Sequence, residues 1–477
     1  MPLGESAGHV GGRGRVFNMN IYLHVETAVR ELDSKLLLAV LAALRGHTVI
    51  VSDMGSIMNG VQSGTLKPGV LHTKSLTPGK EKISRHQFLI DRGFSITSID
   101  EEGGLVDHDY DEFANIRYSE ETIAQASALF GWGTEDTESL KHIYPNYSLK
   151  MYQTGSPRAD LWKQRFAEYW SEPKAVPEKI YLLVSSNTGL CNGMRPFYEN
   201  IKMERNGGYY RRDPDLFARR FGIVAEEYRM THAFIEAIRH LALYSNGFDI
   251  VLRPHPVENI EAWKVYLEGI PNVHVIREGS ITAWVNNAFA IMHNGCTTAI
   301  EATISGKPVI TYLPFEQEYA REIPNELGER VESLDDLTRV ANDFFVASVS
   351  TNKNYERTNI PKSVSKKVYL DDAELAAEKM VKVWESFDGD LSQPSSWRRF
   401  QWLLKAVKAR SMVGSILRKA FPDKFGRPAG ENYKFPPLDE KDIRDRVNRL
   451  QNVLGVDVAL KCKLISERTI LIRKKLL

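Results

Sequence analysis

The sequence predicts an α/β protein with two Rossmann-like, doubly wound domains that face each other across a cleft, followed by a C-terminal appendage. Three observations predict this fold class. The chain has 477 residues, which is too many for one ordinary core. Short β-rich runs alternate with amphipathic helical runs from Asn20 onward. A polar, proline-containing stretch at 171–178 divides this alternation into two series.

The first series begins with a β-rich run at 20–25 and a helical run at 30–45, where leucines recur with the period of a helix. Gly46 ends this helix, and a buried strand at 48–52 follows. A strand, a helix and a second, parallel strand imply a right-handed crossover. Further strands of the first series are expected at 94–100, 124–131 and 148–155.

The second series opens with a strand at 179–185, and a long helix at 219–244 leads into a strand at 248–253. Strands at 289–293 and 308–313 follow, separated by a loop and a helix. Ligands of such sheets bind at the carboxyl ends of the strands. The predicted domain plan is a flexible leader at 1–16, an N-terminal domain at 17–172, a C-terminal domain at 173–387 and the appendage at 388–477.

Charge and cysteine usage exclude several classes of protein. Basic and acidic residues number 62 and 61, so the net charge of +1 predicts no nucleic-acid partner. Cys191, Cys296 and Cys462 form no closely spaced pair, which disfavours a disulfide framework and a structural zinc site and fits the reducing cytoplasm. No run approaches the roughly 20 apolar residues of a membrane span, and the glycine-rich start lacks the apolar segment of a signal peptide.

A rigid basic motif, Arg253–Pro254–His255–Pro256, follows directly on an expected strand. The prolines fix the backbone and push each preceding residue away from the helical conformation. His255 is therefore held rigidly at a strand's carboxyl end, beside a guanidinium suited to bidentate phosphate contact. Glu258, which follows two residues after the motif, is a further candidate for contact with the ligand. The alternative is a rigid turn in which the histidine only caps the structure.

A second motif, His-Asn-Gly-Cys-Thr-Thr, connects an expected strand to a helix. Gly295 lets the backbone approach a ligand closely, and the free amides of the helix start form an anion site with the hydroxyls of Thr297 and Thr298. Glu301, one turn further, can accept hydrogen bonds from a ribose or sugar hydroxyl. The alternative is a helix N-terminus capped by Asn294 or a threonine.

Two weaker signals concern phosphate or carboxylate binding. Ser186 and Asn187 lie in a loop of small polar residues after the first strand of the second series, where they can cradle a phosphate or a sugar carboxylate. The alternative is an ordinary loop. Arg158 can neutralise an anionic donor or form an ion pair with Asp160, and the sequence favours the ion pair.

Three consecutive acids, Asp100, Glu101 and Glu102, precede Gly103 and Gly104 at the end of an expected strand. The glycines predict a mobile turn. If two of the carboxylates face the cleft, repulsion and burial raise the pKa of one, as a general acid or base requires. The alternative is a solvated acidic turn. Glu101 and Glu102 are the first catalytic candidates and Asp100 the third, and the sequence does not rank the first two.

These motifs together resemble those of bacterial surface-polysaccharide glycosyltransferases of the GT-B type. The resemblance covers about residues 17–330 and is closest to surface carbohydrate biosynthesis proteins related to retaining β-Kdo transferases, which use CMP-Kdo. It implies transfer of Kdo, or a related ulosonic acid, from a CMP-activated donor to a bacterial surface glycan or glycolipid acceptor. His255, Pro256, Thr297 and Thr298 would hold CMP in a nucleotide-sugar domain, and the acid–acid–Gly motif would activate the acceptor in the first domain.

The resemblance to retaining enzymes also implies a carboxylate nucleophile and a covalent intermediate. Asp213, Asp215 and Glu226 are candidates besides the acids at 100–102, and the role stays open. No metal or other cofactor is expected, because GT-B enzymes usually stabilise the leaving nucleotide with helix dipoles and basic side chains.

The appendage contains a basic amphipathic segment at 397–424, with Asp423 as its single acid and apolar residues such as Trp402 and Phe421 interleaved. Such a segment suits the anionic inner face of the cytoplasmic membrane, which would make the protein peripheral. The alternative is a helix that packs on the two domains. A helix at 433–454 and a β-hairpin at 458–475 are expected after it.

Three other functions remain open from the sequence. One is a UDP-sugar 2-epimerase, which shares the two-domain architecture. Another is polyol-phosphate transfer from CDP-glycerol, where His–Pro motifs also occur. The third is a non-catalytic scaffold of a polysaccharide-assembly complex, against which the acids at 100–102 argue.

Overall fold

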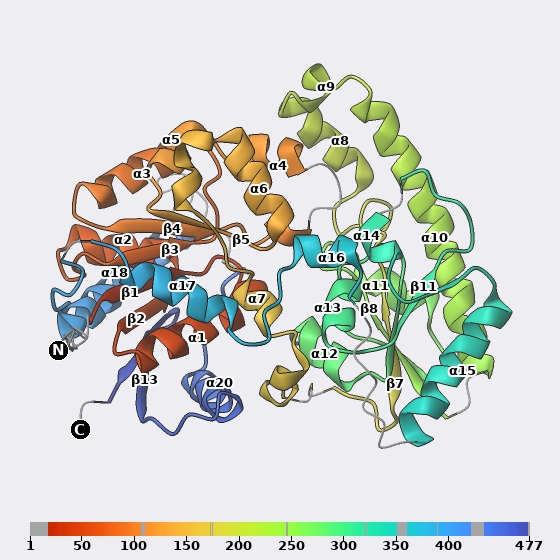
Figure 1. The fold of residues 1–477 in the computed structure, drawn as a ribbon. Helices are drawn as coiled ribbons and strands as arrows, with labels where there is room; N and C mark the ends of the chain where they lie inside the picture. The colour runs from red at the N-terminus through yellow and green to blue at the C-terminus, as the bar shows by residue number, and fades with distance from the viewer. Residues whose placement is uncertain are drawn as a thin grey trace, which may run out of the picture.

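Two β-sheets, each covered by helices on both faces, form the two halves of the molecule (Figure 1). This computed structural model describes residues 18–105, 110–171, 173, 175–244, 247–319, 322–350, 360–388, 390–420 and 434–475. The predicted leader at 1–16 lies outside the described residues. The architecture is the α/β, GT-B-type arrangement that the alternation of strands and helices predicts.

The first sheet has the strand order β13-β14-β2-β1-β3-β4-β5-β6. β1 to β6 are parallel, and β13 and β14 are antiparallel to their neighbours. Residues on both faces of the central strands are buried, which is why these strands are near-continuous apolar runs. The strands are β1 (Asn20–His24), β2 (Thr48–Ser52), β3 (Val70–Thr73), β4 (Ser95–Ile99), β5 (Ala128–Gly131), β6 (Met151–Gln153), β13 (Leu460–Ser466) and β14 (Thr469–Lys474).

The helix after β1 is buried on nearly every side, because α17, α20 and the first sheet all pack against it. Gly46 follows the end of this helix, and its φ of 100° lies in the left-handed region that favours glycine. The chain turns there and leads into β2. The helices between the strands of this half are α1 (Ala28–Leu44), α2 (Met54–Gln62), α3 (Lys80–Ile90), α4 (Tyr110–Arg117), α5 (Glu120–Ala124), α6 (Thr134–Ile143) and α7 (Pro157–Asp160).

The second sheet is entirely parallel, with the order β12-β11-β10-β7-β8-β9. Its strands are β7 (Tyr181–Ser185), β8 (Asp249–Arg253), β9 (Val273–Val275), β10 (Ala290–His293), β11 (Val309–Tyr312) and β12 (Glu329–Val331). Its helices are α8 (Phe197–Asn206), α9 (Tyr209–Arg212), α10 (Leu216–Tyr244), α11 (Ile260–Tyr266), α12 (Ile281–Asn287), α13 (Thr298–Ile304), α14 (Glu322–Asn325) and α15 (Leu334–Ser350).

The chain returns from the second half to the first through α16 (Lys362–Lys367) and α17 (Ala376–Glu385). One buried ion pair ties the outward and return crossings together. Lys163 Nζ donates to Asp160 Oδ1 at 2.8 Å and to the carbonyl of Asp371 at 2.8 Å, while Asp160 Oδ2 accepts from the amide of Ala377 at 3.1 Å. Asp160 therefore pairs with Lys163, and the ion pair expected between it and Arg158 is not formed.

The C-terminal residues extend the first sheet. β14 pairs with β2, so the strand that would otherwise form the sheet edge is covered, and β13 becomes the edge. Ile470 and Ile472 face one core and Leu471 faces the other, so the hairpin is buried on both faces. The helices of this segment are α18 (Trp397–Ala420) and α20 (Glu440–Val453), which lie on opposite faces of the hairpin.

Candidate functional site

The Arg253–Pro256 motif leaves β8 at its carboxyl end, as predicted, but the arginine and the histidine have different surroundings. The guanidinium of Arg253 is buried and donates to the carbonyls of Arg277, at 3.2 Å, Glu278 and Gly279, at 3.0 Å. Burial lowers the pKa of Arg253 to about 10. Arg253 thus holds the loop after β9 in place, whereas the half-buried His255 reaches an open cavity.

Glu258 organises the loops around this motif. Its carboxylate is fully buried and accepts hydrogen bonds from the hydroxyl of Ser186 at 2.8 Å and the amide of Thr188 at 3.0 Å. It also accepts from the amide of His255 at 3.3 Å and from the indole Nε1 of Trp263 at 2.6 Å. Ser186 and Glu258, both predicted to contact a ligand, therefore bind each other and fix the loops after β7 and β8.

The loop after β10 is shaped by Gly295, whose φ of 67° favours glycine. Its amide donates to Asn325 Oδ1 at 2.6 Å, and its carbonyl accepts from Asn187 Nδ2 at 3.2 Å. The buried Oδ1 of Asn294 has no hydrogen-bond partner within the described chain. A buried polar atom left unpaired costs free energy, so this oxygen is a candidate for contact with a ligand donor.

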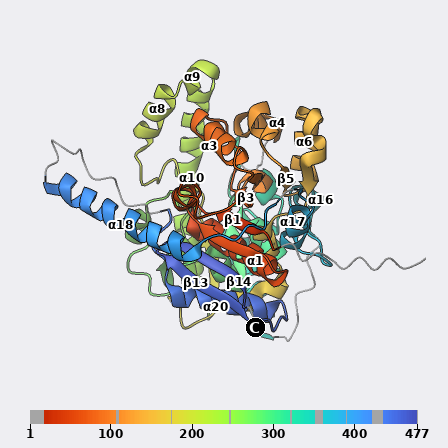
Figure 2. The same ribbon diagram turned by 90° about the vertical axis from the view of Figure 1, so that its left-hand side faces the viewer.

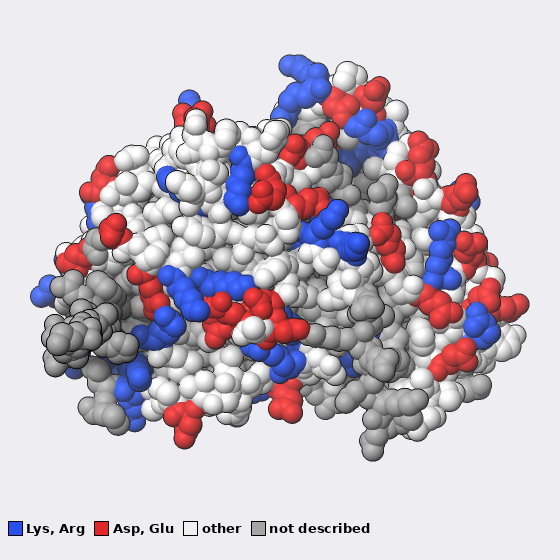
Figure 3. Space-filling view, viewed as in Figure 1, with Lys and Arg blue, Asp and Glu red and all other residues white. Residues whose placement is uncertain are grey.

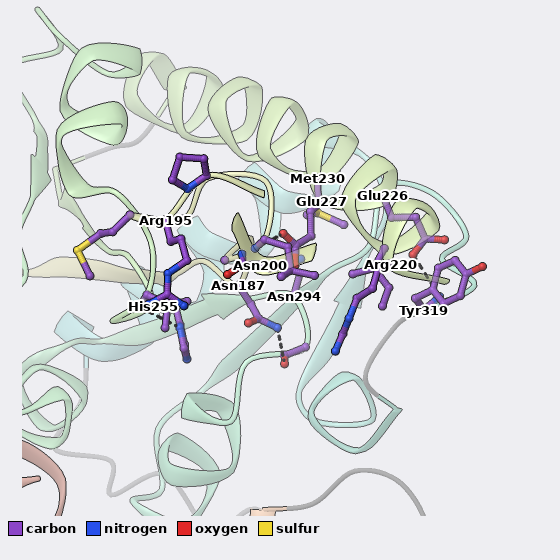
Figure 4. A pocket seen from close by; sticks show the side chains of 18 of the residues that line it. Asn187, Arg195, Asn200, Arg220, Glu226, Glu227, Met230, His255, Asn294 and Tyr319 are labelled. Carbon is purple, nitrogen blue, oxygen red and sulfur yellow. Dashed lines mark hydrogen bonds between the residues drawn. The ribbon is translucent and has the colours of Figure 1, made fainter. Parts of the chain in front are cut away.

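A cavity of about 1020 Å³ opens where these loops meet, at the carboxyl ends of β7, β8 and β10. Figure 4 shows Arg195 and His255 on one side of it, and Arg220, Glu226 and Tyr319 on the other. A cavity of this size holds a nucleotide with an attached sugar. The predicted residues that line it are Asn187, His255, Asn294 and Gly295.

Several residues that line the cavity were not predicted as binding residues. They come from the start of α8, from α10 and from the loop before α14, which lie far from the two motifs in sequence. Glu226, named only as a possible nucleophile, accepts hydrogen bonds from the amides of Glu318 at 2.7 Å and Tyr319 at 3.2 Å. These additional lining residues include Arg195, Glu199, Asn200, Glu204, Arg220, Glu227, Gln317, Tyr319 and Asn325.

The remaining predicted residues of this half lie beside the cavity and do not line it. Thr298 Oγ1 is 3.2 Å from Cys296 Sγ, Thr297 is half-buried, and Pro256 is exposed. Glu301 is buried in the first turn of α13, and burial raises its pKa. The nearest cations to its carboxylate are those of Arg158 and Arg253.

Arg158 lies between carboxylates of the two halves. Burial lowers the pKa of this guanidinium, and the charges of Glu301, from the second half, and Glu101, from the first, oppose that effect. The guanidinium also lies 5.4 Å from the ring of Trp162. Arg158 therefore interacts electrostatically with buried carboxylates from both halves.

The three acids of the first half have three different environments. Asp100 is buried and receives two hydrogen bonds from Arg117, at 2.8 and 2.9 Å, and burial raises its pKa while the guanidinium opposes the shift. Glu101 is buried and accepts from Lys35 Nζ at 2.6 Å. Glu102 has a side chain that is 48% exposed and accepts from Arg30 at 3.0 Å. Only Glu102 among the three has an exposed carboxylate.

The turn after these acids is packed against an aromatic ring, in contrast to the mobile turn that the glycines predict. Gly103–Leu105 form a short 3-10 turn, and a Cβ on Gly104 would lie 2.4 Å from the ring of Trp132. The indole Nε1 of Trp132 donates to the carbonyl of Asp100 at 2.7 Å. The missing side chain at Gly104 allows this close packing.

Within the described residues, no group of three or more His, Cys, Asp or Glu side chains is arranged to hold a metal ion. No described helix combines the length and apolarity that crossing a membrane requires. The face shown in Figure 3 carries basic and acidic side chains intermixed over both halves.

No protein-family model matches this sequence, and no curated protein matches it. Solved structures with a similar course of the chain include a putative UDP-N-acetylglucosamine 2-epimerase from Listeria monocytogenes, with 13% identity and a TM-score of 0.45 over 77% of this chain and 96% of that one. The catalytic domain of starch synthase IV from Arabidopsis thaliana has 10% identity and a TM-score of 0.38 over 79% of this chain and 100% of that one. The wall teichoic acid polymerase TagF has 8% identity and a TM-score of 0.41 over 78% of this chain and 89% of that one. At such low identities and TM-scores the likeness concerns the fold alone.

Proposed function

We propose that this protein is a glycosyltransferase that binds a nucleotide-activated sugar in the cavity of its second half. The observation that carries the proposal is the convergence of two separate sequence motifs, through His255 and Asn294–Gly295, on one cavity at the carboxyl ends of parallel strands. A scaffold protein has no need of such a cavity. The Oδ1 of Asn294, which has no hydrogen-bond partner within the described chain, can accept a hydrogen bond from a nucleoside. The side-chain amide of Asn187 can form another.

The diphosphate or monophosphate of the donor needs a cation, and Arg253 does not supply it. Arg220 lines the cavity but pairs with Glu204 at 2.8 Å. Arg195 lines the cavity without an ion pair to any carboxylate in the described chain, so we assign the phosphate contact to Arg195 and His255. His255 Nδ1 accepts from the amide of Val257 at 3.4 Å, which favours the tautomer with its hydrogen on Nε2, and we assign this N–H to a phosphate oxygen of the donor.

We further propose that the donor is CMP-Kdo or a related CMP-ulosonic acid, and that the acceptor is a bacterial surface glycan or glycolipid. The support is the resemblance of the Arg–Pro–His–Pro and Asn–Gly–Cys–Thr–Thr segments to those of CMP-Kdo enzymes. Glu102 is the acid assigned to the acceptor hydroxyl, because its carboxylate is exposed although it pairs with Arg30. The carboxylates of Asp100 and Glu101 are buried in ion pairs. The nucleophile of a retaining reaction is not assigned.

Thermal-shift titration with CMP, UDP and CDP-glycerol tests this proposal, since a ligand that binds only the folded state raises the melting temperature. We expect stabilisation by CMP alone in the wild type and none in His255→Ala. The control is His232→Ala, an exposed histidine on α10 away from the cavity. A response confined to UDP would favour an epimerase, and one confined to CDP-glycerol would favour polyol-phosphate transfer. A positive CMP result is followed by transfer assays with CMP-Kdo generated in situ.

A further inference from the structure

The apolar side chains that anchor helix α18 lie in its first two turns, and Lys408, further along, forms an ion pair with Glu467 of the hairpin at 2.6 Å. Phe400 and Leu404 are buried against α2 and the hairpin, and a Cβ on Gly60 of α2 would lie 2.7 Å from the ring of Phe400. After Leu404, every described side chain, 405–413, is exposed. Figure 2 shows α18 extending away from the rest of the molecule, above β13 and β14. A helix this exposed does not gain its stability from the domain cores.

The side of α18 opposite its docked face carries an exposed apolar patch of Trp402 and Val413, and the exposed Arg398 lies on the same side, one turn before Trp402. With 3.6 residues per turn, Trp402 and Val413 point in directions about 20° apart, and both Phe400 and Leu404 lie about 160° from Trp402. Trp402 is 72% exposed and Val413 is 56% exposed. Ala406 and Ala409 fall between them on the same face. A large aromatic ring is thus held away from the protein by a helix whose other side is anchored.

Cations flank this apolar face, and α18 contains no Asp or Glu. By the same helical geometry, Lys405 lies about 60° to one side of Trp402, and Arg410 lies about 80° to the other side. Both are exposed, and the ammonium of Lys405 lies 5.4 Å from the ring of Trp402. Long basic side chains on the borders of an apolar face can reach phosphate groups while the apolar face enters the acyl layer.

The neighbouring edge of the first sheet adds to the positive charge. β13 contacts α18, and Lys463 on this strand donates to Gln401 at 3.3 Å.

We propose that α18 docks the protein onto an anionic phospholipid surface, with Trp402 and Val413 entering the interface and Lys405 and Arg410 contacting lipid phosphates. A protein partner or a second copy of this chain would have to match a small apolar patch surrounded by the cations of Arg398, Lys405 and Arg410, whereas an anionic bilayer presents both chemistries at once. The docking is peripheral and does not depend on which nucleotide the cavity binds. It brings the active cleft to an acceptor that is carried on lipid.

Cosedimentation of the full-length protein with vesicles tests the proposal. We expect binding to vesicles of phosphatidylethanolamine and phosphatidylglycerol, little binding to phosphatidylcholine alone, and weaker binding at high salt. Lys405→Glu/Arg410→Glu should lose at least tenfold in vesicle affinity, and Trp402→Ala several-fold. The matched controls are Lys80→Glu/Lys264→Glu, which changes net charge equally at exposed sites, and Leu149→Ala, which removes an exposed apolar side chain elsewhere.

All four variants change exposed side chains, so each should melt as the wild type does. Equal loss of vesicle binding in the controls would overturn the proposal, as would binding to phosphatidylcholine as strong as to the anionic vesicles. Concentration-dependent dimers in light scattering that Trp402→Ala abolishes, without any vesicle binding by the wild type, would assign the helix to self-association instead. The nucleotide response of the Lys405→Glu/Arg410→Glu variant should be unchanged, which separates a failure of this proposal from a failure of the donor assignment.

Discussion

The buried carboxylate of Glu258 accepts a hydrogen bond from the indole Nε1 of Trp263 at 2.6 Å. The same carboxylate binds Ser186, Thr188 and the amide of His255, so one acid connects the loops after β7 and β8 to α11. Cores rarely bury an ionised carboxylate unless it is fully hydrogen-bonded, and four donors meet that condition here. His255 owes its position to this network as well as to its flanking prolines.

Glu258→Gln tests this role. In glutamine an NH2 group takes the place of one acceptor oxygen, and this NH2 group would face hydrogen-bond donors. We therefore expect a loss of about 3 kcal/mol in the free energy of unfolding, measured by denaturant unfolding. Nucleotide binding should weaken although Glu258 does not line the cavity. Glu261→Gln, at an exposed position on α11, is the control and should have no such effect. Unchanged stability in Glu258→Gln would show that the network is not essential.

The sequence predicts the cavity's two motifs because each follows directly on an apolar strand, and the carboxyl ends of parallel strands meet at one edge of a sheet. It does not predict which groups of a motif face the ligand. Arg253 and Glu258 have the chemistry of ligand contacts, yet their partners are carbonyls, amides, a hydroxyl and an indole of the protein, up to 72 residues away in sequence. The cavity wall from α8 and α10 has no strand-end signature at all, and only the fold brings it to His255.

For the fold, too, some features are predicted from the sequence and others are not. Long apolar strands such as β2 and β8 are predicted within a residue or two, because burial on both faces requires apolar runs. β3 is missed, since its His72 and Thr73 resemble a loop. The histidine is nevertheless buried, with Nδ1 3.1 Å from Thr97 Oγ1 on the neighbouring strand. The hairpin is predicted as a local unit, but its pairing with β2 is a contact over 400 residues that no local pattern encodes.

Glu102→Gln should retain nucleotide binding and lose transfer by at least about 100-fold, because removal of a general base typically costs that much. The substitution leaves Arg30 with a neutral partner at a half-exposed position, so stability should change little. Thermal shift with CMP and a transfer assay measure the two effects. Glu112→Gln, at an exposed position on α4, should be fully active. Full transfer by Glu102→Gln would remove it from the catalytic assignment.

Glu101→Gln should instead act through stability. It breaks a buried ion pair with Lys35, and an unpaired buried ammonium costs about 3–5 kcal/mol. The double variant Lys35→Met/Glu101→Leu removes both charges and should recover much of that loss. Denaturant unfolding of the two variants measures the difference. If Glu101→Gln is as stable as the wild type but inactive, the catalytic role belongs to Glu101.

Gly104→Ala should destabilise the protein by about 1–3 kcal/mol, because the new Cβ overlaps the ring of Trp132, which is itself buried. Gly103→Ala is the matched control, since its Cβ would have no neighbour nearer than 3.5 Å. Thermal melts of both variants measure the contrast. Equal melting temperatures would indicate that the turn moves freely, as the two glycines alone predict.

The stability of the fold should depend on buried neutral histidines. Burial lowers the pKa of His86 to about 4 and those of His24 and His293 to about 3, from an ordinary value near 6.5. The unfolded chain then binds more protons than the folded chain between about pH 6.5 and pH 4. Stability contributed by these neutral side chains is therefore complete above pH 6.5 and is lost as the pH falls through this window.

His86 offers the cleanest test, because it is buried on α3 and neither ring nitrogen has a hydrogen-bond partner within the described chain. His86→Leu removes its titration, so between pH 7.5 and pH 5 the variant should lose about 2 kcal/mol less unfolding free energy than the wild type. Denaturant unfolding at several pH values measures both curves, and His142→Leu, at an exposed position on α6, is the control. Parallel curves for His86→Leu and the wild type would mean that His86 has the same pKa in the folded protein as in the unfolded chain. The remaining slope of the variant would then report the other buried histidines.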